Sequence, residues 1–110
     1  MHEVALSEQL ARVVSRAACG RPVTAIRLDI GALRQVVPET LVHAWTFVSA
    51  RSGLGGSTLI INEIDAVVEC ENGHTRVLRG VPDVTCHRCE APTRVIAGNE
   101  FRVVSIDVKT

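Results

Sequence analysis

The sequence is short of aromatic side chains, and this limits how a core can be built. Its 110 residues include two Phe, one Trp and no Tyr, so aromatic residues make up only 3% of the chain. A core must therefore consist mainly of Val, Leu, Ile and Ala, within the 46% of residues that are hydrophobic. That fraction argues against disorder, and the length suits about one domain.

An excess of positive or negative charge is also absent. The chain has 12 Lys plus Arg and 12 Asp plus Glu, and residues 66–97 balance as well, with four acids and four bases. Nonspecific attraction to nucleic acid or to an anionic membrane needs a basic excess or a basic arm. We therefore expect neither nucleic acid nor a membrane among the partners of this protein.

Long apolar runs and catalytic motifs are missing too. The longest stretches without a charged residue have eleven residues, as in residues 40–50, whereas a transmembrane helix needs about 18. The opening M-H-E-V does not resemble a signal peptide, so we expect a cytoplasmic protein with reduced thiols. No G-x-x-x-x-G-K-[ST] motif and no nucleophile at a recognisable spacing from a base are present, which indicates that the protein is not an enzyme.

Two segments have apolar residues at helical spacing. The first predicts a helix over residues 4–19, which ends before Gly20 and Pro22, with Cys19 buried on its inner side. The second predicts a helix over residues 38–50, which begins with Pro and Glu and leaves His43 in solvent. The expected buried positions are Leu6, Leu10, Val13, Val14 and Ala17 in the first helix, and Leu41, Val42, Trp45 and Val48 in the second.

Alternating apolar residues predict strands over residues 24–30, 58–64 and 101–108. The last strand is expected to have Val104, Ile106 and Val108 on one side. The order of elements predicts an α+β fold, with two helices on a small mixed three-stranded sheet and an inserted zinc-ribbon-like module of short antiparallel strands. The predicted domains are residues 1–65 plus 98–110, and the inserted module at residues 66–97.

The inserted module contains the pattern C-x3-H-x11-C-x2-C, formed by Cys70, His74, Cys86 and Cys89. Two short turns separated by a loop can bring four such ligands to a tetrahedral zinc ion. His87 is a competing fourth ligand, although its place between the two later cysteines points its side chain away from the site. Because the module has few large apolar side chains, metal would supply its folding free energy.

Two other interpretations of the cysteines stay open. Cys86 and Cys89 could form a redox pair, as in thioredoxin-like proteins, but no helical pattern follows them to stabilise a thiolate. The module could also be a zinc ribbon that binds a protein or nucleic-acid partner. Its neutral charge and lack of stacking aromatic residues count against nucleic acid.

The amino terminus offers a second kind of metal site. The amine of Met1, the amide and imidazole nitrogens of His2 and the amide of Glu3 can supply a planar set of four nitrogens. Such ligation suits Ni(II) or Cu(II). The alternative is that these residues only lead into the first helix, with the acid of Glu3 favourable near its N-terminus.

Several stretches of the sequence are similar to those of one family. They are the opening M-H-E-V-A-L-S-E, V-V-P-E before the second helix, the cysteine module, and the closing G-N-E-F-R-V-V-S-I-D-V. Together they resemble the HypA/HybF family of hydrogenase-maturation nickel metallochaperones, over nearly the whole chain. The resemblance implies a nickel site on Met1, His2 and Glu3 and a structural zinc site in the module. It also implies delivery of nickel to the large subunit of a [NiFe]-hydrogenase, together with a nickel-handling GTPase.

The chain departs from the family pattern at one point. The family has a second cysteine in the first turn of the module, whereas this chain reads Cys70-Glu71-Asn72-Gly73-His74. The hypothesis is therefore a nickel metallochaperone whose zinc is held by three thiolates and His74. The alternative is a zinc-ribbon interaction module without nickel delivery, and the chain could be a monomer or a dimer.

Overall fold

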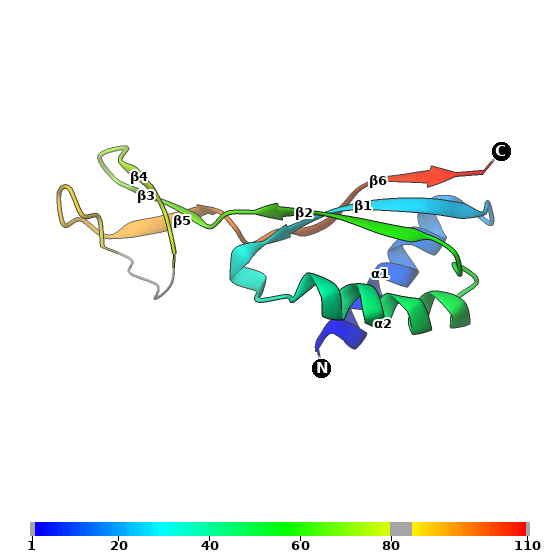
Figure 1. The fold of residues 1–110 in the computed structure, drawn as a ribbon. Coiled ribbons are helices and arrows are strands. Elements are labelled where there is room, and N and C mark those ends of the chain that lie inside the picture. The colour runs from blue at the N-terminus through cyan, green and yellow to red at the C-terminus, as the bar shows by residue number, and fades with distance from the viewer. Residues whose placement is uncertain (1, 80–84, 110) are drawn as a thin grey trace. The chain divides into compact units, whose positions relative to one another are not determined.

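The computed structural model describes residues 2–79 and 85–109 (Figure 1). They form two compact units, one with both α-helices and most of β1, β2 and β6, the other with Ile30–Gln35 and Glu63–Phe101. The elements, in chain order, are α1 (His2–Ala18), β1 (Val23–Gly31), the 3-10 helix η1 (Ala32–Arg34), α2 (Pro38–Arg51), β2 (Thr58–Ile64), β3 (Val67–Cys70), β4 (Thr75–Val77), β5 (Thr93–Ala97) and β6 (Phe101–Val108).

The first unit contains a three-stranded sheet in the order β2-β1-β6, with α1 and α2 on one face (Figure 1). Ile26 and Leu28 of β1 are fully buried, as are Leu10 of α1 and Leu41 of α2. Trp45 is also buried, and its indole N–H donates to Ser57 Oγ at 3.0 Å. This core is built almost entirely from aliphatic side chains, and the predicted α+β fold class is confirmed.

The buried face of α1 differs from the predicted one. Val13 is 44% exposed and Ala17 is exposed, so both expectations were wrong. The helix instead buries a row of mostly small side chains, which allow α1 to pack closely against α2. This row is Glu3, Ser7, Leu10, Ala11, Val14 and Ala18. Leu10 and Val14 were predicted correctly, whereas Ser7, Ala11 and Ala18 were not, because Ser and Ala resemble surface residues.

Three further placements correct the sequence-based predictions. Cys19 is exposed, because α1 ends at Ala18 and Cys19 takes a left-handed conformation with φ 51°. Val42 is exposed in α2, where Ala44 and Ser49 are buried instead. In β6, Val104 is 57% exposed, whereas Ile106 and Val108 are half-buried. The alternation of that strand shifts by one residue, since Ser105 is also exposed.

An ion pair joins the three strands of this sheet. Arg102 of β6 donates two hydrogen bonds to Asp29 Oδ2 of β1, at 3.1 and 2.9 Å, and Asn62 Nδ2 of β2 donates to Asp29 Oδ1 at 3.0 Å. The Asn62 hydrogen bond first, and then Arg102, hold the pKa of the Asp29 carboxyl below its usual range. The carboxylate therefore stays charged and accepts three hydrogen bonds.

The second unit contains a smaller antiparallel sheet in the order β4-β3-β5. On one side of β3, Val67 pairs with Val77 of β4, and on the other side Val68 pairs with Val95 of β5. This unit also includes Ile30–Gln35, which lay outside the module predicted at residues 66–97. Whether that predicted module folds as a separate domain stays a prediction.

Two glycines allow close backbone contact within the second unit. Gly31 N–H donates to the carbonyl of Glu100 at 2.7 Å, and Leu33 N–H donates to that of Gly98 at 2.8 Å. A Cβ on Gly31 would lie 2.1 Å from the carbonyl carbon of Gly98. Gly98 itself has φ +109°, and its N–H donates to the carboxylate of Glu100 at 2.9 Å. Glycine is thus required at both positions.

Candidate metal centre

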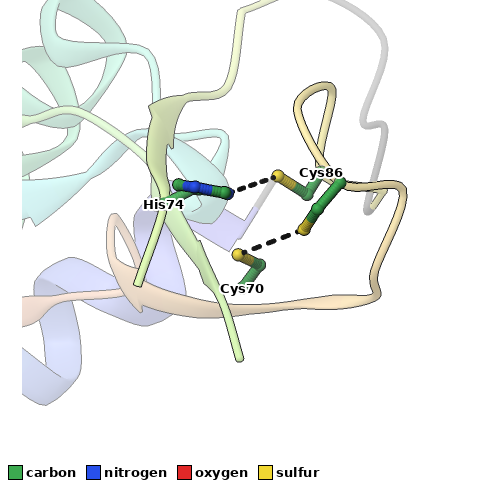
Figure 2. A group of neighbouring side chains, drawn as sticks. Cys70, His74 and Cys86 are labelled. Atoms are coloured by element: carbon green, nitrogen blue, oxygen red, sulfur yellow. Dashed lines mark hydrogen bonds between the residues drawn. The ribbon is translucent and has the colours of Figure 1, made fainter. Parts of the chain in front are cut away.

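Four side chains of the second unit converge on one point (Figure 2). Cys70 ends β3 and His74 directly precedes β4, while Cys86 and Cys89 lie in a turn before β5. The ligand atoms that the four residues offer all lie within 4.8 Å of one another. The structure therefore brings together the four residues singled out by the spacing of the sequence.

Two turns position these side chains. In the first, Gly73 N–H donates to the carbonyl of Cys70 at 3.0 Å, and Cys70 N–H donates to that of His74 at 2.9 Å. Gly73 has φ +84°, a conformation that glycine adopts without strain. In the second, Glu90 N–H donates to the carbonyl of Cys86 at 2.9 Å. Each turn closes directly after a cysteine and so holds its thiol in place.

Hydrogen bonds to sulfur surround the cluster. The backbone N–H of Asn72 donates to Cys70 Sγ at 3.3 Å, and that of Arg88 donates to Cys86 Sγ at 3.4 Å. The side-chain amide of Asn72 also donates to Cys89 Sγ at 3.3 Å. Such donors favour the thiolate form that a metal requires. The role of Asn72 was not predicted from the sequence, in which the one indication is its position two residues after Cys70.

Two distances within the cluster match those of a tetrahedral zinc ion. Zinc bonds of about 2.3 Å to sulfur and 2.0–2.1 Å to nitrogen separate two sulfurs by about 3.8 Å, and a sulfur and a nitrogen by about 3.6 Å. The sulfur atoms of Cys70 and Cys89 are 3.7 Å apart, and Cys86 Sγ is 3.5 Å from His74 Nδ1 (Figure 2). The donor set of three thiols and one imidazole therefore suits zinc in both chemistry and size.

The two buried thiols differ in acidity. The backbone N–H groups of Arg88 and Cys89, aided by His74, lower the pKa of the Cys86 thiol to about 6. Burial raises the pKa of the Cys70 thiol. A low thiol pKa is also what a redox cysteine would need. Here, however, the donors that lower it are those of a turn built around the cluster.

His87 is not part of this group. The cluster in the described part of the chain consists of the four residues above, and His87 is exposed. Of the two histidines considered as the fourth ligand, only His74 thus lies beside the thiols.

The amino-terminal candidates lie in the first unit. Met1 is outside the described residues. His2 begins α1, two residues earlier than predicted, and its side chain is 53% exposed. Its Nε2 lies 3.4 Å from Oε2 of Glu3, whose side chain is only 8% exposed. The pKa of the Glu3 carboxyl is lowered, mainly because its own backbone N–H donates to it.

The fold and the cluster define a small α+β protein with a site of three thiols and one imidazole suited to a metal ion. A family model described as "Hydrogenase/urease nickel incorporation, metallochaperone, hypA" matches residues 1–108, and the chain belongs to this family. The resemblance found in the sequence is thereby confirmed. Members of this family are metallochaperones, so the protein is not an enzyme.

Individual relatives agree with this assignment. The protein is 30% identical over 115 residues to the hydrogenase maturation factor HypA of Desulfosudis oleivorans, with 99% of each chain covered. It is 32% identical over 111 residues to that of Geobacter metallireducens, which covers 99% of this chain and 100% of the relative. The solution structure of the Ni metallochaperone HypA from Helicobacter pylori matches with a TM-score of 0.65 at 17% identity, over 96% of both chains. That likeness concerns the fold alone.

Within the described residues, no helix combines the length and the apolar character that crossing a membrane requires.

Proposed function

We propose that this chain binds Ni(II) at Met1, His2 and Glu3 and delivers it for the maturation of a [NiFe]-hydrogenase. Zn(II) held by three thiolates and one imidazole, from Cys70, His74, Cys86 and Cys89, has a structural role. The observation that carries the proposal is the family match over residues 1–108, which includes the amino-terminal residues. The zinc-ribbon interaction module without nickel delivery is the alternative, and it lacks such support.

Local chemistry at the start of α1 supports the nickel part. The first N–H groups of a helix have no acceptor within the helix. The amides of His2 and Glu3 can therefore lose their protons to a metal without breaking helical hydrogen bonds. Ni(II) accepts such planar nitrogen ligation. The Glu3 carboxylate, 3.4 Å from the imidazole, would orient the His2 ring.

The two metals would have different tasks. Zinc in a closed set of four ligands supplies folding free energy and is released slowly. Nickel at an amino-terminal site can leave by ligand exchange, which is what transfer requires. We place the transfer in the cytoplasm, in a complex with a nickel-handling GTPase and the hydrogenase large subunit. Residues 1–65 and 98–110 would form the nickel-binding domain, and residues 66–97 the zinc module.

A titration of Ni(II) into the native chain and into the same chain extended by one residue before Met1 tests the nickel site. The extension removes the terminal amine from the chelate and leaves α1 intact. We expect one equivalent to bind the native chain, with a change in visible absorption, and to be lost on extension. Equal binding by both chains, or binding by neither, would contradict the proposed site.

A further inference from the structure

A groove of about 480 Å³ runs between α1 and α2 in the first unit. Three arginines contribute to its walls, namely Arg12 and Arg16 of α1 and Arg51 at the end of α2. The remaining lining is Glu8, Ala11, Ser15, Val48 and Ser52. Arginines that are 35 or more residues apart in the sequence thus meet on one surface, although the chain has no net charge.

These three guanidinium groups differ from two arginines on the strands of the same unit. Arg27 is paired with Asp107 at 2.8 Å, and Arg102 is paired with Asp29 at 2.9 Å. In the described part of the chain, Arg12, Arg16 and Arg51 are exposed and have no ion pair with an acid. Like charges one helical turn apart, as on α1, repel each other. An anion in the groove would relieve that repulsion.

Among the described residues that line the groove, Glu8 is the only acid. It lies four residues before Arg12 on α1, the spacing at which Glu and Arg attract each other. Glu8 can therefore neutralise Arg12 but leaves Arg16 and Arg51 without a counter-charge. The groove keeps a net positive charge, with the hydroxyl of Ser15 as a further hydrogen-bond donor.

We propose that this groove docks an acidic segment of a partner protein. Guanidinium groups bind carboxylates through paired hydrogen bonds, which the exposed side chains of Arg16 and Arg51 can supply. Nucleic acid fits less well, because the lining that the structure describes includes no aromatic residue on which a base could stack.

The position of the groove indicates that docking would assist nickel transfer, a role that rests on the proposed function. Arg12 lies nine residues after Glu3 on α1, about 13 Å along the helix axis. A partner held by its acidic segment would therefore stay within reach of the amino-terminal nickel ligands. Such proximity raises the rate of ligand exchange without a change in nickel affinity.

Fluorescence anisotropy with a short labelled peptide of alternating Glu and Ala tests the groove, in the zinc-loaded, nickel-free full chain at low salt. We expect binding that weakens as salt is added. The double variant Arg16→Gln, Arg51→Gln should bind about three- to tenfold more weakly. The control Arg79→Gln, Arg94→Gln removes the same charge from exposed arginines of the other unit and should bind like the parent chain. Circular dichroism checks that each variant is folded.

Several results would overturn the inference. They are absence of peptide binding to the parent chain, equal weakening in both double variants, equally strong binding of a Lys-Ala peptide, or tighter binding of pyrophosphate or single-stranded RNA at the same arginines. None of these results depends on nickel. Failure of the groove and failure of the amino-terminal nickel site can therefore be told apart.

Discussion

Single residues decide how the sulfur atoms of the metal centre are held. The ligands themselves could be predicted, because Cys and His at the spacing C-x3-H-x11-C-x2-C are visible in the sequence. The N–H groups of Asn72 and Arg88 that point at sulfur could not, since they depend on the backbone of the two turns. The amino-terminal ligands were suggested by residue type alone, and their role stays a prediction.

His74 is expected to be the fourth zinc ligand, so His74→Ala should lower zinc affinity by about tenfold or more. Its Nδ1 lies 3.5 Å from Cys86 Sγ, at the separation that two ligands of one zinc ion require. His87→Ala is the matched control, because it removes an exposed imidazole of the same module. Competition with a zinc-sensitive dye measures both affinities. Unchanged affinity in His74→Ala, or a larger loss in His87→Ala, would refute this ligand set.

In zinc-free protein whose two turns are still folded, Cys86 should be the more reactive of the two buried cysteines. A thiol reacts as its thiolate, which forms above the pKa, and the pKa of Cys86 is about 6. Alkylation of Cys86 should therefore be half-maximal near pH 6, whereas that of Cys70, whose pKa is raised from 9.0, needs alkaline pH. Mass spectrometry of peptides after iodoacetamide treatment gives both profiles. Coinciding profiles in protein whose β3 amides are still protected from hydrogen exchange would show that the turn N–H groups do not distinguish the thiols.

The positions of the helices and strands along the chain were easier to predict than the faces that they bury. Gly20, Pro22 and Pro38 mark the helix ends, and the strands at residues 58–64 and 101–108 were located correctly. The buried face of α1 was predicted only in part, because small side chains such as Ala11 are buried beside Leu10 and Val14. The contacts of the arginine groove were also hidden, since they arise only when α1 and α2 pack together.

The contact between Gly31 and Gly98 should make Gly31→Ala strongly destabilising. The new Cβ would lie 2.1 Å from a backbone carbon, and a backbone cannot move aside as a flexible side chain can. We expect the free energy of unfolding to fall by about 2–3 kcal/mol in urea denaturation. Gly55→Ala is the control, because its Cβ would lie 3.7 Å from Ala50 Cα and should change stability by about 0.5 kcal/mol or less. Similar stabilities of the two variants would contradict the packing described here.

The ion pair at Asp29 should stabilise the first sheet in a pH-dependent manner. The folded-state pKa of Asp29 lies below its usual 3.8, so the stabilisation is present above that value and is lost as the pH falls through the lowered pKa. Asp29→Asn should therefore lower the melting temperature at pH 7 and have a smaller effect in acid. Asp107→Asn breaks a pair that is about half exposed on both sides, and it should change the melting temperature less. An equal effect of both substitutions at pH 7 would argue against a special role for Asp29.

In the molecule as a whole, the two units draw their stability from different sources. The first has a core shared by two helices and a sheet, with Leu10, Ile26 and Leu41 fully buried. The second has short strands, and Val68 is its one large side chain with exposure below 2% in the described chain. Burial alone gives such a sheet little stability. The metal cluster must then supply much of what holds β3, β4 and β5 together.

Removal of zinc by a chelator is therefore expected to unfold one unit and leave the other intact. Hydrogen exchange read by mass spectrometry should show that the amides of β3, β4 and β5 lose protection, whereas those of α1 and α2 keep it. Adding zinc back should restore the protection, because binding energy is converted into folding energy. Simultaneous loss in both units would mean that the chain unfolds as one cooperative body, contrary to the predicted domains. Full protection of β3 without zinc would instead mean that the short sheet is stable on its own, so that the cluster serves binding rather than structure.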